Sequence, residues 1–227
     1  MIIPVMDIMN NDCVSGKSGH RSTYKHLNSI YGNTPLEIAI NLKKKGAKLL
    51  YIADLDKIEN NGNNDSLISS INEVIPVLLD NGISNIKDVE NNQKISTYSI
   101  LATETMTNIS TTMKIFKKID RKHLLISIDI KNNEILSKNN AINVENIIQL
   151  INNIKPKYTI ILNITQVGTK QQQSSELIKK IINETPYTQH IIAGGITNTA
   201  IKKYQKQNIN HFLIGTILHE GNLKYNL

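Results

Sequence analysis

The sequence predicts a single (β/α)₈ barrel built from two similar half-barrels, and three observations lead to this prediction. Short apolar, β-branched runs alternate with segments of helical periodicity along the chain. These runs number eight, which fits a closed barrel better than an open sheet. The length of 227 residues suits one domain, since closed α/β barrels commonly have about 250 residues. We expect one domain over 1–227, with half-barrels at about 1–120 and 121–227.

The strand-like runs are Ile2–Met6, Leu49–Ala53, Val74–Leu79, Ser99–Ala102, Leu124–Ile128, Tyr158–Leu162, His190–Ala193 and Phe212–Ile214. The helical segments between them are Pro35–Lys45, Ser66–Asn72, Asn85–Asn92, Asn108–Ile119, Val144–Ile154, Ser174–Asn183 and Asn198–Lys206. Thr34 and Thr197 stand where N-caps of the first and last of these helices belong. Apolar runs separated by helices indicate a parallel sheet, for which an open, doubly wound arrangement is the alternative.

Composition narrows the classes of partner and site. A net charge of +7 favours an anionic partner, but the lysines are scattered over predicted helix faces without stacking aromatics. We therefore expect a small phosphorylated ligand and no nucleic acid. Cys13 is the only cysteine and the histidines show no paired spacing, so neither a disulfide nor a metal site is expected. No apolar stretch approaches about 18 residues and no signal-peptide pattern opens the chain, which predicts a cytoplasmic protein without a membrane partner.

The sequence contains an internal repeat about half a chain length apart. Asp7-Ile-Met-Asn-Asn-Asp-Cys-Val-Ser15 is similar to Asp129-Ile-Lys-Asn-Asn-Glu-Ile-Leu-Ser137. Further on, 79–84 is similar to 192–197 and 100–104 to 213–217, in the same order. Strands one and five lie opposite each other in an eight-stranded barrel, so Asp7 and Asp129 are expected to face one another across its mouth. One carboxyl would accept a proton and the other donate one; the alternative is that each aspartate caps a turn.

Glycine-rich turns after the last two predicted strands indicate a phosphate site. Gly194 and Gly195 let the backbone approach a ligand, and Gly215 and Thr216 add donors from the neighbouring strand. The corresponding first-half residues, Gly82 and Thr103, are a weaker candidate because Asp80 and Glu104 bring negative charge. The loop Gly16–Lys25 is basic and glycine-hinged, and Lys17, His20 and Arg21 are its candidates for closing over an anionic substrate. A merely flexible surface loop is the alternative.

These residues resemble the histidine-biosynthesis barrel family, which contains ProFAR isomerase and the imidazole glycerol phosphate synthase cyclase. The resemblance runs nearly end to end, through the opening Ile-Ile-Pro-Val-Met-Asp7-Ile and the stretches Asp54-Leu-Asp56, Asn81-Gly-Ile, Asp88-Val, Ser127-Ile-Asp129, Ala193-Gly-Gly-Ile, Ile214-Gly-Thr and Glu220-Gly221. It implies a duplicated half-barrel and a substrate with two phosphates. It also implies an Amadori rearrangement of an aminoaldose without a cofactor, with Asp7 as general base and Asp129 as the general acid that opens the ring.

Departures from the family pattern indicate a diverged paralogue. Where the isomerase usually has Thr-Asp or Thr-Glu and then Asp-Gly-Thr, this chain has Leu162-Asn163 and Val167-Gly168-Thr169, so a polar wall becomes partly apolar. We expect an isomerase that acts on a phosphoribosyl compound or sugar phosphate, as in histidine biosynthesis. The alternatives are a cyclase or lyase with an ammonia-supplying partner, and a non-catalytic paralogue that binds a phosphorylated ligand. No other feature of the sequence indicates a protein partner.

Overall fold

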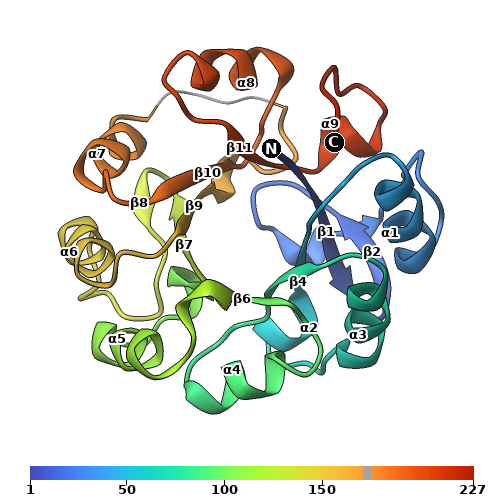
Figure 1. Ribbon diagram of the computed structural model, residues 1–227. Helices are drawn as coiled ribbons and strands as arrows, with labels where there is room; N and C mark the ends of the chain where they lie inside the picture. Colours follow the sequence, from blue (N-terminus) through green and yellow to red (C-terminus); the bar gives the residue numbers. More distant parts are fainter. Residues whose placement is uncertain (171–174) are drawn as a thin grey trace.

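Within residues 1–170 and 175–227, which the computed structural model describes, eight parallel strands close into a barrel (Figure 1). In order around the barrel they are β1 (Ile2–Met9), β4 (Leu50–Asp54), β5 (Val77–Asp80), β6 (Tyr98–Ala102), β7 (Leu124–Lys131), β9 (Tyr158–Asn163), β10 (Gln189–Ala193) and β11 (His211–Ile214). The last strand pairs with the first, so that Ile2 lies opposite Phe212 and Pro4 opposite Ile214. This closure confirms the predicted (β/α)₈ barrel and rules out the open sheet.

An outer layer of helices covers the barrel. It consists of α1 (Pro35–Lys44), α3 (Asp65–Val74), α4 (Ile86–Asn92), α5 (Ile109–Lys118), α6 (Val144–Ile154), α7 (Glu176–Glu184) and α8 (Asn198–Gln205), while the short α2 (Leu55–Ile58) and α9 (Thr216–His219) follow β4 and β11. Short 3₁₀ helices are η1 (Arg21–Thr23), η2 (Thr103–Thr105), η3 (Arg121–His123) and η4 (Ile164–Gln166). The predicted N-caps are confirmed, because Thr34 accepts the Glu37 N–H and Thr197 accepts the Ala200 N–H. The predicted helix start at Ser174 lies outside the described residues.

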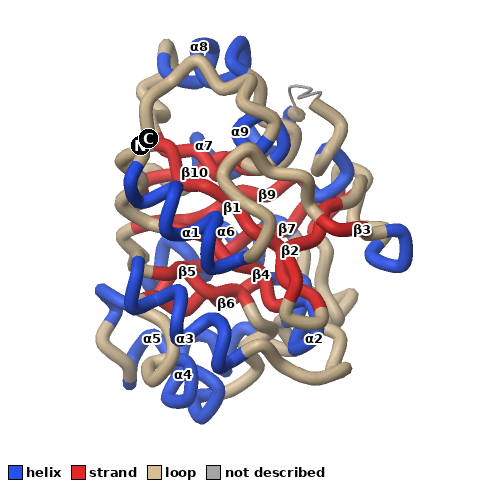
Figure 2. Tube along the Cα trace, turned by 90° about the vertical axis from the view of Figure 1, so that its right-hand side faces the viewer, coloured by secondary structure: helices blue, strands red, loops and turns tan. Residues whose placement is uncertain are grey.

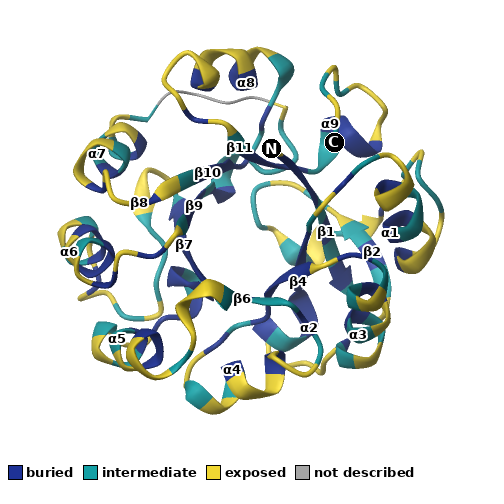
Figure 3. Ribbon diagram, viewed as in Figure 1, coloured by how far each residue is buried: buried dark blue, intermediate teal, exposed yellow. Residues whose placement is uncertain are grey.

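Two apolar clusters explain how the layers hold together. The larger fills the space between the strands and the helices and includes Ile52, Ile126 and Ile161. The smaller fills the inside of the barrel and includes Ile3, Leu125 and other residues at alternate strand positions. Because successive strand side chains point to opposite faces, each strand supplies both clusters in turn. Figure 3 shows the buried strands at the centre and the exposed residues on the outer helix faces.

One predicted strand begins too early. The sequence predicts a strand over Val74–Leu79, but α3 continues to Val74 and β5 begins at Val77. Ile75 still donates its N–H to the Ile71 carbonyl and buries its side chain against the same core as the helix. The apolar run therefore holds the end of a helix and the start of a strand, and Pro76, which has no N–H, separates them.

Two strands run further than predicted because each continues into a β-hairpin. β1 turns back into β2 (Asp12–Ser15), which pairs with β3 (Lys25–His26), and β7 turns back into β8 (Glu134–Ile135). Both turns place two asparagines in the left-handed region, with φ of 53° and 58° at Asn10 and Asn11 and of 52° and 64° at Asn132 and Asn133. Asparagine tolerates this conformation, which type I′ hairpin turns require. The repeated sequence thus forms the same hairpin twice.

The two ends of the barrel differ in what they carry. Figure 2 shows the N- and C-termini together at one end, and the segment around β3 at the other. The second end carries the turns that follow the parallel strands, which is where barrels of this class place their binding sites. A search of the described residues finds no helix with the length and apolar character needed to cross a membrane.

Candidate active site

A cavity of about 350 Å³ opens at the carboxyl ends of the strands. Its walls come from both half-chains, and they include Asp7, Asp80 and Asp129 together with Gly194 and Gly215. The volume suits a small molecule, since ligand pockets commonly measure about 300–1,000 Å³. The predicted acid–base pair and the predicted glycine turns of the second half thus line one space.

Strand register explains why acidic side chains line this cavity. Asp7 lies beside Ala53, which lies beside Asp80, and all three side chains line the cavity. In the other half, Asp129 lies beside Leu162, which lies beside Ala193. In β1, β4 and β5 these positions come two residues after apolar side chains that fill the inside of the barrel, so they point in the same direction. Both predicted catalytic aspartates therefore lie within strands and face the cavity.

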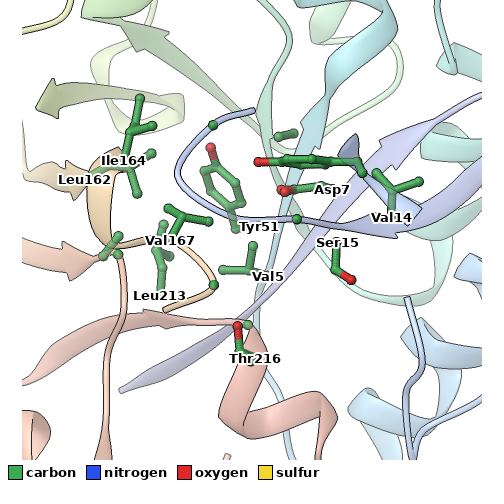
Figure 4. A pocket seen from close by; sticks show the side chains of 18 of the residues that line it. Val5, Asp7, Val14, Ser15, Tyr51, Leu162, Ile164, Val167, Leu213 and Thr216 are labelled. Carbon is green, nitrogen blue, oxygen red and sulfur yellow. The ribbon is translucent and has the colours of Figure 1, made fainter. Parts of the chain in front are cut away.

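Asp7 is half-buried, and no hydrogen bond reaches its carboxylate from the described residues. Burial raises the pKa of Asp7 from 3.8 to about 6, and the nearby Arg21 charge acts in the opposite direction. A carboxylate without hydrogen-bond donors and with a raised pKa is suited to accept a proton near neutral pH. Figure 4 shows Asp7 on the cavity wall near Tyr51.

Asp129 lies in a different environment, because the residue is only 1% exposed and its carboxylate accepts three hydrogen bonds. Ser127 Oγ donates at 2.8 Å, the Glu104 N–H at 3.0 Å and Thr103 Oγ1 at 3.4 Å. Burial raises the pKa of Asp129 above its ordinary value, the three donors counteract this, and the Glu104 charge raises it further. The donors also fix the orientation of the carboxyl group, which is not the case at Asp7.

Two more carboxylates line the cavity on the first-half side. Asp80 accepts a hydrogen bond from Tyr51 Oη at 3.1 Å, and burial together with the Asp129 and Glu104 charges raises its pKa. Glu104 accepts two hydrogen bonds from Arg21 Nη2, both at 2.9 Å. This side of the cavity is therefore acidic, as expected from Asp80 and Glu104 in the sequence.

The glycine turns of the second half have the backbone conformation that only glycine adopts readily. Gly194 has a φ of 92° and Gly195 a φ of 63°. A Cβ at Gly194 would lie 2.2 Å from the Asn163 carbonyl oxygen, so this turn packs directly against the end of β9. Gly194, Gly195, Gly215 and Thr216 all line the cavity. The four candidates for a phosphate cradle thus lie together on one side.

The first-half counterparts are placed differently. Thr103 is fully buried, with its hydroxyl against Asp129, and Gly82 is not among the residues that line the cavity. The buried Asn81 side chain exchanges two hydrogen bonds of 2.8 Å with that of Asn92. The geometry brings Gly82 and Thr103 to the right end of the barrel but directs their polar groups toward the protein itself.

The loop after β2 crosses the cavity and rests on the opposite wall. Ser18 donates its N–H to the Val167 carbonyl at 3.0 Å and its hydroxyl to the Thr165 carbonyl at 2.8 Å. Of the three predicted loop residues, Arg21 lines the cavity, whereas Lys17 and His20 are exposed and do not. The loop therefore presents one cation to the site rather than a basic surface.

The lining residues that were not predicted include two tyrosines and a histidine. Tyr51 and Tyr24 contribute aromatic rings, and His219, which is 2% exposed, donates from Nε2 to the Val5 carbonyl at 2.8 Å. Its other ring nitrogen, Nδ1, then accepts the Ser29 hydroxyl at 2.9 Å, and burial lowers the pKa of His219. Tyr51 could have been found from the inward alternation of β4, but His219 depends on contacts distant in sequence.

The two carboxylates of the Asp54-Leu-Asp56 stretch support the site without lining it, whereas Leu55 is one of the lining residues. Asp54 accepts the Asn64 backbone N–H at 3.0 Å, and Asp56 accepts the Asn10 N–H at 2.6 Å. The Asn64 side chain donates to both carboxylates, at 2.6 and 2.9 Å. These residues thus connect the turn after β4 to the β1–β2 hairpin. No cluster of three or more His, Cys, Asp or Glu in the described ranges is arranged to hold a metal ion.

Comparison with known families covers almost the whole chain. Residues 1–224 match the model of the family described as histidine biosynthesis protein. The chain belongs to the histidine biosynthesis protein family. The match agrees with the resemblance seen in the sequence motifs.

Relatives of this family member include isomerases and a protein without a named activity. An uncharacterized protein of Methanocaldococcus jannaschii is 32% identical over 226 residues, covering 97% of this chain and 93% of the relative. A ProFAR isomerase (a phosphoribosyl imidazole-4-carboxamide isomerase) of Clostridium botulinum strain Okra is 27% identical over 241 residues, covering 100% and 95%. The ProFAR isomerase of M. jannaschii is also 27% identical, over 234 residues. This member of the family is therefore isomerase-like at the family level.

The wall formed by β9 and its loop is mainly apolar. Leu162, Ile164 and Val167 line the cavity, and Figure 4 shows them together on the side away from Asp7 and Val14. Asn163, in contrast, is buried and its Oδ1 has no hydrogen-bond partner in the described structure. This histidine biosynthesis protein thus presents an apolar wall to the cavity at the end of β9.

Proposed function

We propose that the protein is a cofactor-free isomerase that performs an aldose–ketose rearrangement of the Amadori type on a phosphoribosyl compound or sugar phosphate. The observation that carries the proposal is the pair of carboxyls from opposite strands, Asp7 and Asp129, in one cavity. Their environments differ, since one has no hydrogen-bond donor and the other has three. Such a difference separates the roles of base and acid.

In the proposed reaction Asp129 donates a proton to the ring oxygen of the sugar as the C–O bond at the aminated carbon breaks. This leaves an open-chain protonated imine. Asp7 removes a proton from the neighbouring carbon, giving an enolamine that tautomerises to the aminoketose. Both protons move between carboxyl groups and substrate, so that no oxidant or reductant is consumed. Positioned proton transfer of this kind contributes about 10² to 10⁴ in rate for each group.

The proposed ligand is a small phosphorylated compound, and neither nucleic acid nor a membrane is proposed as a partner. Its phosphate lies on the backbone of Gly194, Gly195, Gly215 and Thr216, which line the cavity beside β10 and β11. The lysine pairs Lys43-Lys44 and Lys117-Lys118 are exposed on the outer helices and are solvated surface. We also propose a cytoplasmic location, and two half-barrels, which the paired hairpins at Asn10 and Asn132 support.

We further propose that the protein is a diverged paralogue with a substrate related to that of ProFAR isomerase. Two observations support this proposal: the apolar wall around Leu162, and the higher identity to the uncharacterized M. jannaschii protein than to the isomerase of the same organism. A cyclase with an ammonia-supplying partner and a non-catalytic binding paralogue are the competing outcomes.

The test is complementation of a histidine auxotroph that lacks the isomerase, together with turnover assays. Rescue by the wild type but not by Asp7→Asn or Asp129→Asn supports the acid–base pair, while the exposed Asp12→Asn serves as the matched control. The double variant should lose far less than the product of the single losses, because both residues serve one reaction. Wild-type rates in both single variants would overturn the proposal and favour a binding paralogue.

A further inference from the structure

The segment from the end of β9 through η4 turns its apolar side chains to the cavity and its polar ones away. Leu162, Ile164 and Val167 line the cavity and lie together in Figure 4, and we call these three residues the apolar wall. The polar residues between them, at 163, 165 and 166, are not among the lining residues. Thr165 Oγ1, for example, accepts the Asn132 N–H at 2.8 Å. The ligand therefore meets hydrocarbon on this side.

The apolar wall lies beside the residues of the proposed chemistry. In the sheet register Leu162 lies between Asp129, the proposed acid, and Ala193, the residue before the glycine turn. Leu213 and Val5 also line the cavity, and Figure 4 shows them next to the wall. A ligand that reaches from the glycine turn to Asp129 therefore passes along this apolar surface.

The loop that crosses the cavity encloses the apolar wall. Gly19 packs on it so closely that a Cβ there would lie 2.8 Å from Ile164 Cγ2. The lysine and the arginine that line the cavity in the described structure, Lys170 and Arg21, are each paired with a glutamate, at 2.7 and 2.9 Å. Neither adds an unpaired charge to the wall. A group held between wall and loop leaves water, which favours an apolar group and disfavours a charged one.

The first-half turns are unsuited to a second phosphate, because their donors already bind aspartates of the protein. Gly82 does not line the cavity, and its N–H interacts with Asp80. The Glu104 N–H donates to Asp129 at 3.0 Å. Thr103 Oγ1 accepts the Asp129 N–H at 2.8 Å and donates to the carboxylate of the same residue at 3.4 Å. A phosphate that took these donors would leave a buried carboxylate without them, which is costly.

We propose that the substrate carries a single phosphate, and that the group on its amine nitrogen is uncharged and apolar. This inference rests on the proposed function, which places the phosphate at the glycine turns and the reacting sugar carbons at Asp7 and Asp129. The nitrogen substituent is the part of such a substrate that these sites leave unassigned, and the apolar wall is the surface that it meets. Leu162 and Val167 are specificity-determining residues in this arrangement.

The test uses calorimetric titration of the full chain with stable sugar-alcohol phosphates. Ribitol 5-phosphate is compared with 1-anilino-1-deoxyribitol 5-phosphate, and with two derivatives of the anilino compound that carry a phosphate or a tert-butyl group in the para position. Fully burying a phenyl-sized side chain corresponds to a factor of about 10 to 100 in affinity, so the anilino compound should bind more tightly than ribitol 5-phosphate by about that factor. The para-phosphate compound should bind at least about tenfold more weakly than the para-tert-butyl compound, which is similar in size but uncharged.

Two substitutions test whether the apolar wall makes this contact. Leu162→Asn and Val167→Thr nearly keep the size of the side chain but make it polar. Each should reduce the affinity advantage of the anilino compound by about three- to tenfold, while the affinity for ribitol 5-phosphate stays about the same. Val144→Thr is the matched control, because Val144 on α6 is also half-buried but does not line the cavity. This variant should keep the full advantage.

The comparison of probes on the wild type keeps the proposal testable if neither variant folds. Equal affinity for the anilino compound and ribitol 5-phosphate, or tighter binding of the para-phosphate than of the para-tert-butyl compound, would overturn this inference alone. So would an anilino advantage that both variants keep in full. Rescue of the histidine auxotroph would support the acid–base pair but overturn the single phosphate, since the substrate named for the isomerases carries two phosphoribosyl groups. Absence of binding by every probe would overturn the glycine cradle, and with it both proposals.

Discussion

Replacing Asp7 with asparagine should stabilise the ligand-free protein while it removes activity. The half-buried carboxylate has no hydrogen-bond donor among the described residues, so Asn keeps its size and sacrifices no bond. Burial raises the pKa of Asp7 from 3.8 to about 6. Each tenfold change in an ionisation constant corresponds to about 1.4 kcal/mol. The ionised Asp7 carboxylate therefore lowers the free energy of unfolding by at most about 3 kcal/mol. Because water in the open cavity screens the charge, we expect a gain of about 1–3 kcal/mol at pH 8.

The sign of the pH dependence follows from the raised pKa. The folded protein holds the Asp7 proton more tightly than the unfolded chain, so wild-type stability falls as the pH rises from 3.8 through about 6. The Asp7→Asn variant does not lose stability in this way, because asparagine does not ionise. The difference in stability between the variant and the wild type should therefore be largest above pH 7 and about half as large at pH 5. It should be close to zero at pH 3.8.

Urea unfolding followed by circular dichroism at pH 5 and pH 8 measures both quantities. Asp12→Asn, whose carboxylate is 43% exposed, is the control and should change stability little. A variant at position 7 that is no more stable than the wild type at pH 8 would refute the burial argument. A stabilisation independent of pH would assign the effect to packing instead of ionisation.

Three further predictions concern the loop cation and the glycine turns. Arg21→Gln should raise the pKa of Asp7, because the Arg21 charge lowers it, and should move the acid limb of the kcat/KM profile to higher pH. Gly194→Ala should cost about 2–4 kcal/mol in urea unfolding, since its Cβ would lie 2.2 Å from Asn163 O, while Gly215→Ala, with its nearest atom at 3.8 Å, should be tolerated. Sulfate soaked into crystals should occupy the turns at Gly194 and Gly215 before those at Gly82 and Thr103, and equal or reversed occupancy would contradict the ranking of the two halves.

Patterns in the sequence predicted the parts of the fold that depend on residues close together in the chain. Alternating apolar runs located the eight strands, and the paired Asp7 and Asp129 segments placed the acids at one end of the barrel. The error at Val74 arose because a helix end and a strand start share one apolar run. Periodicity alone does not separate two elements of the same hydrophobicity.

Features that depend on distant contacts were not predictable in this way. The interaction of Arg21 with Glu104 joins residues 83 positions apart, and that of His219 with Val5 spans 214 positions. The inward direction of Tyr51 was accessible from strand alternation, but its partner Asp80 comes from another strand. Side-chain chemistry indicates which groups need partners, whereas only the closed barrel determines which partners they meet.

The paired hairpins hold the acids independently of the loops that follow. Asp7 pairs through the backbone with Ala53 on one side and Val14 on the other, and the Asp129 carbonyl accepts the Leu136 N–H while its strand pairs with β9. Each hairpin tip is also tied to the next turn, at Asn10 by Asp56 and at Asn132 by Thr165 Oγ1. Insertions beyond these tips would therefore leave both carboxyls where they are. In a barrel built in this way the loops that cover the cavity can change during evolution, and the substrate can change with them. The two carboxyl groups, and the reaction they perform, stay the same.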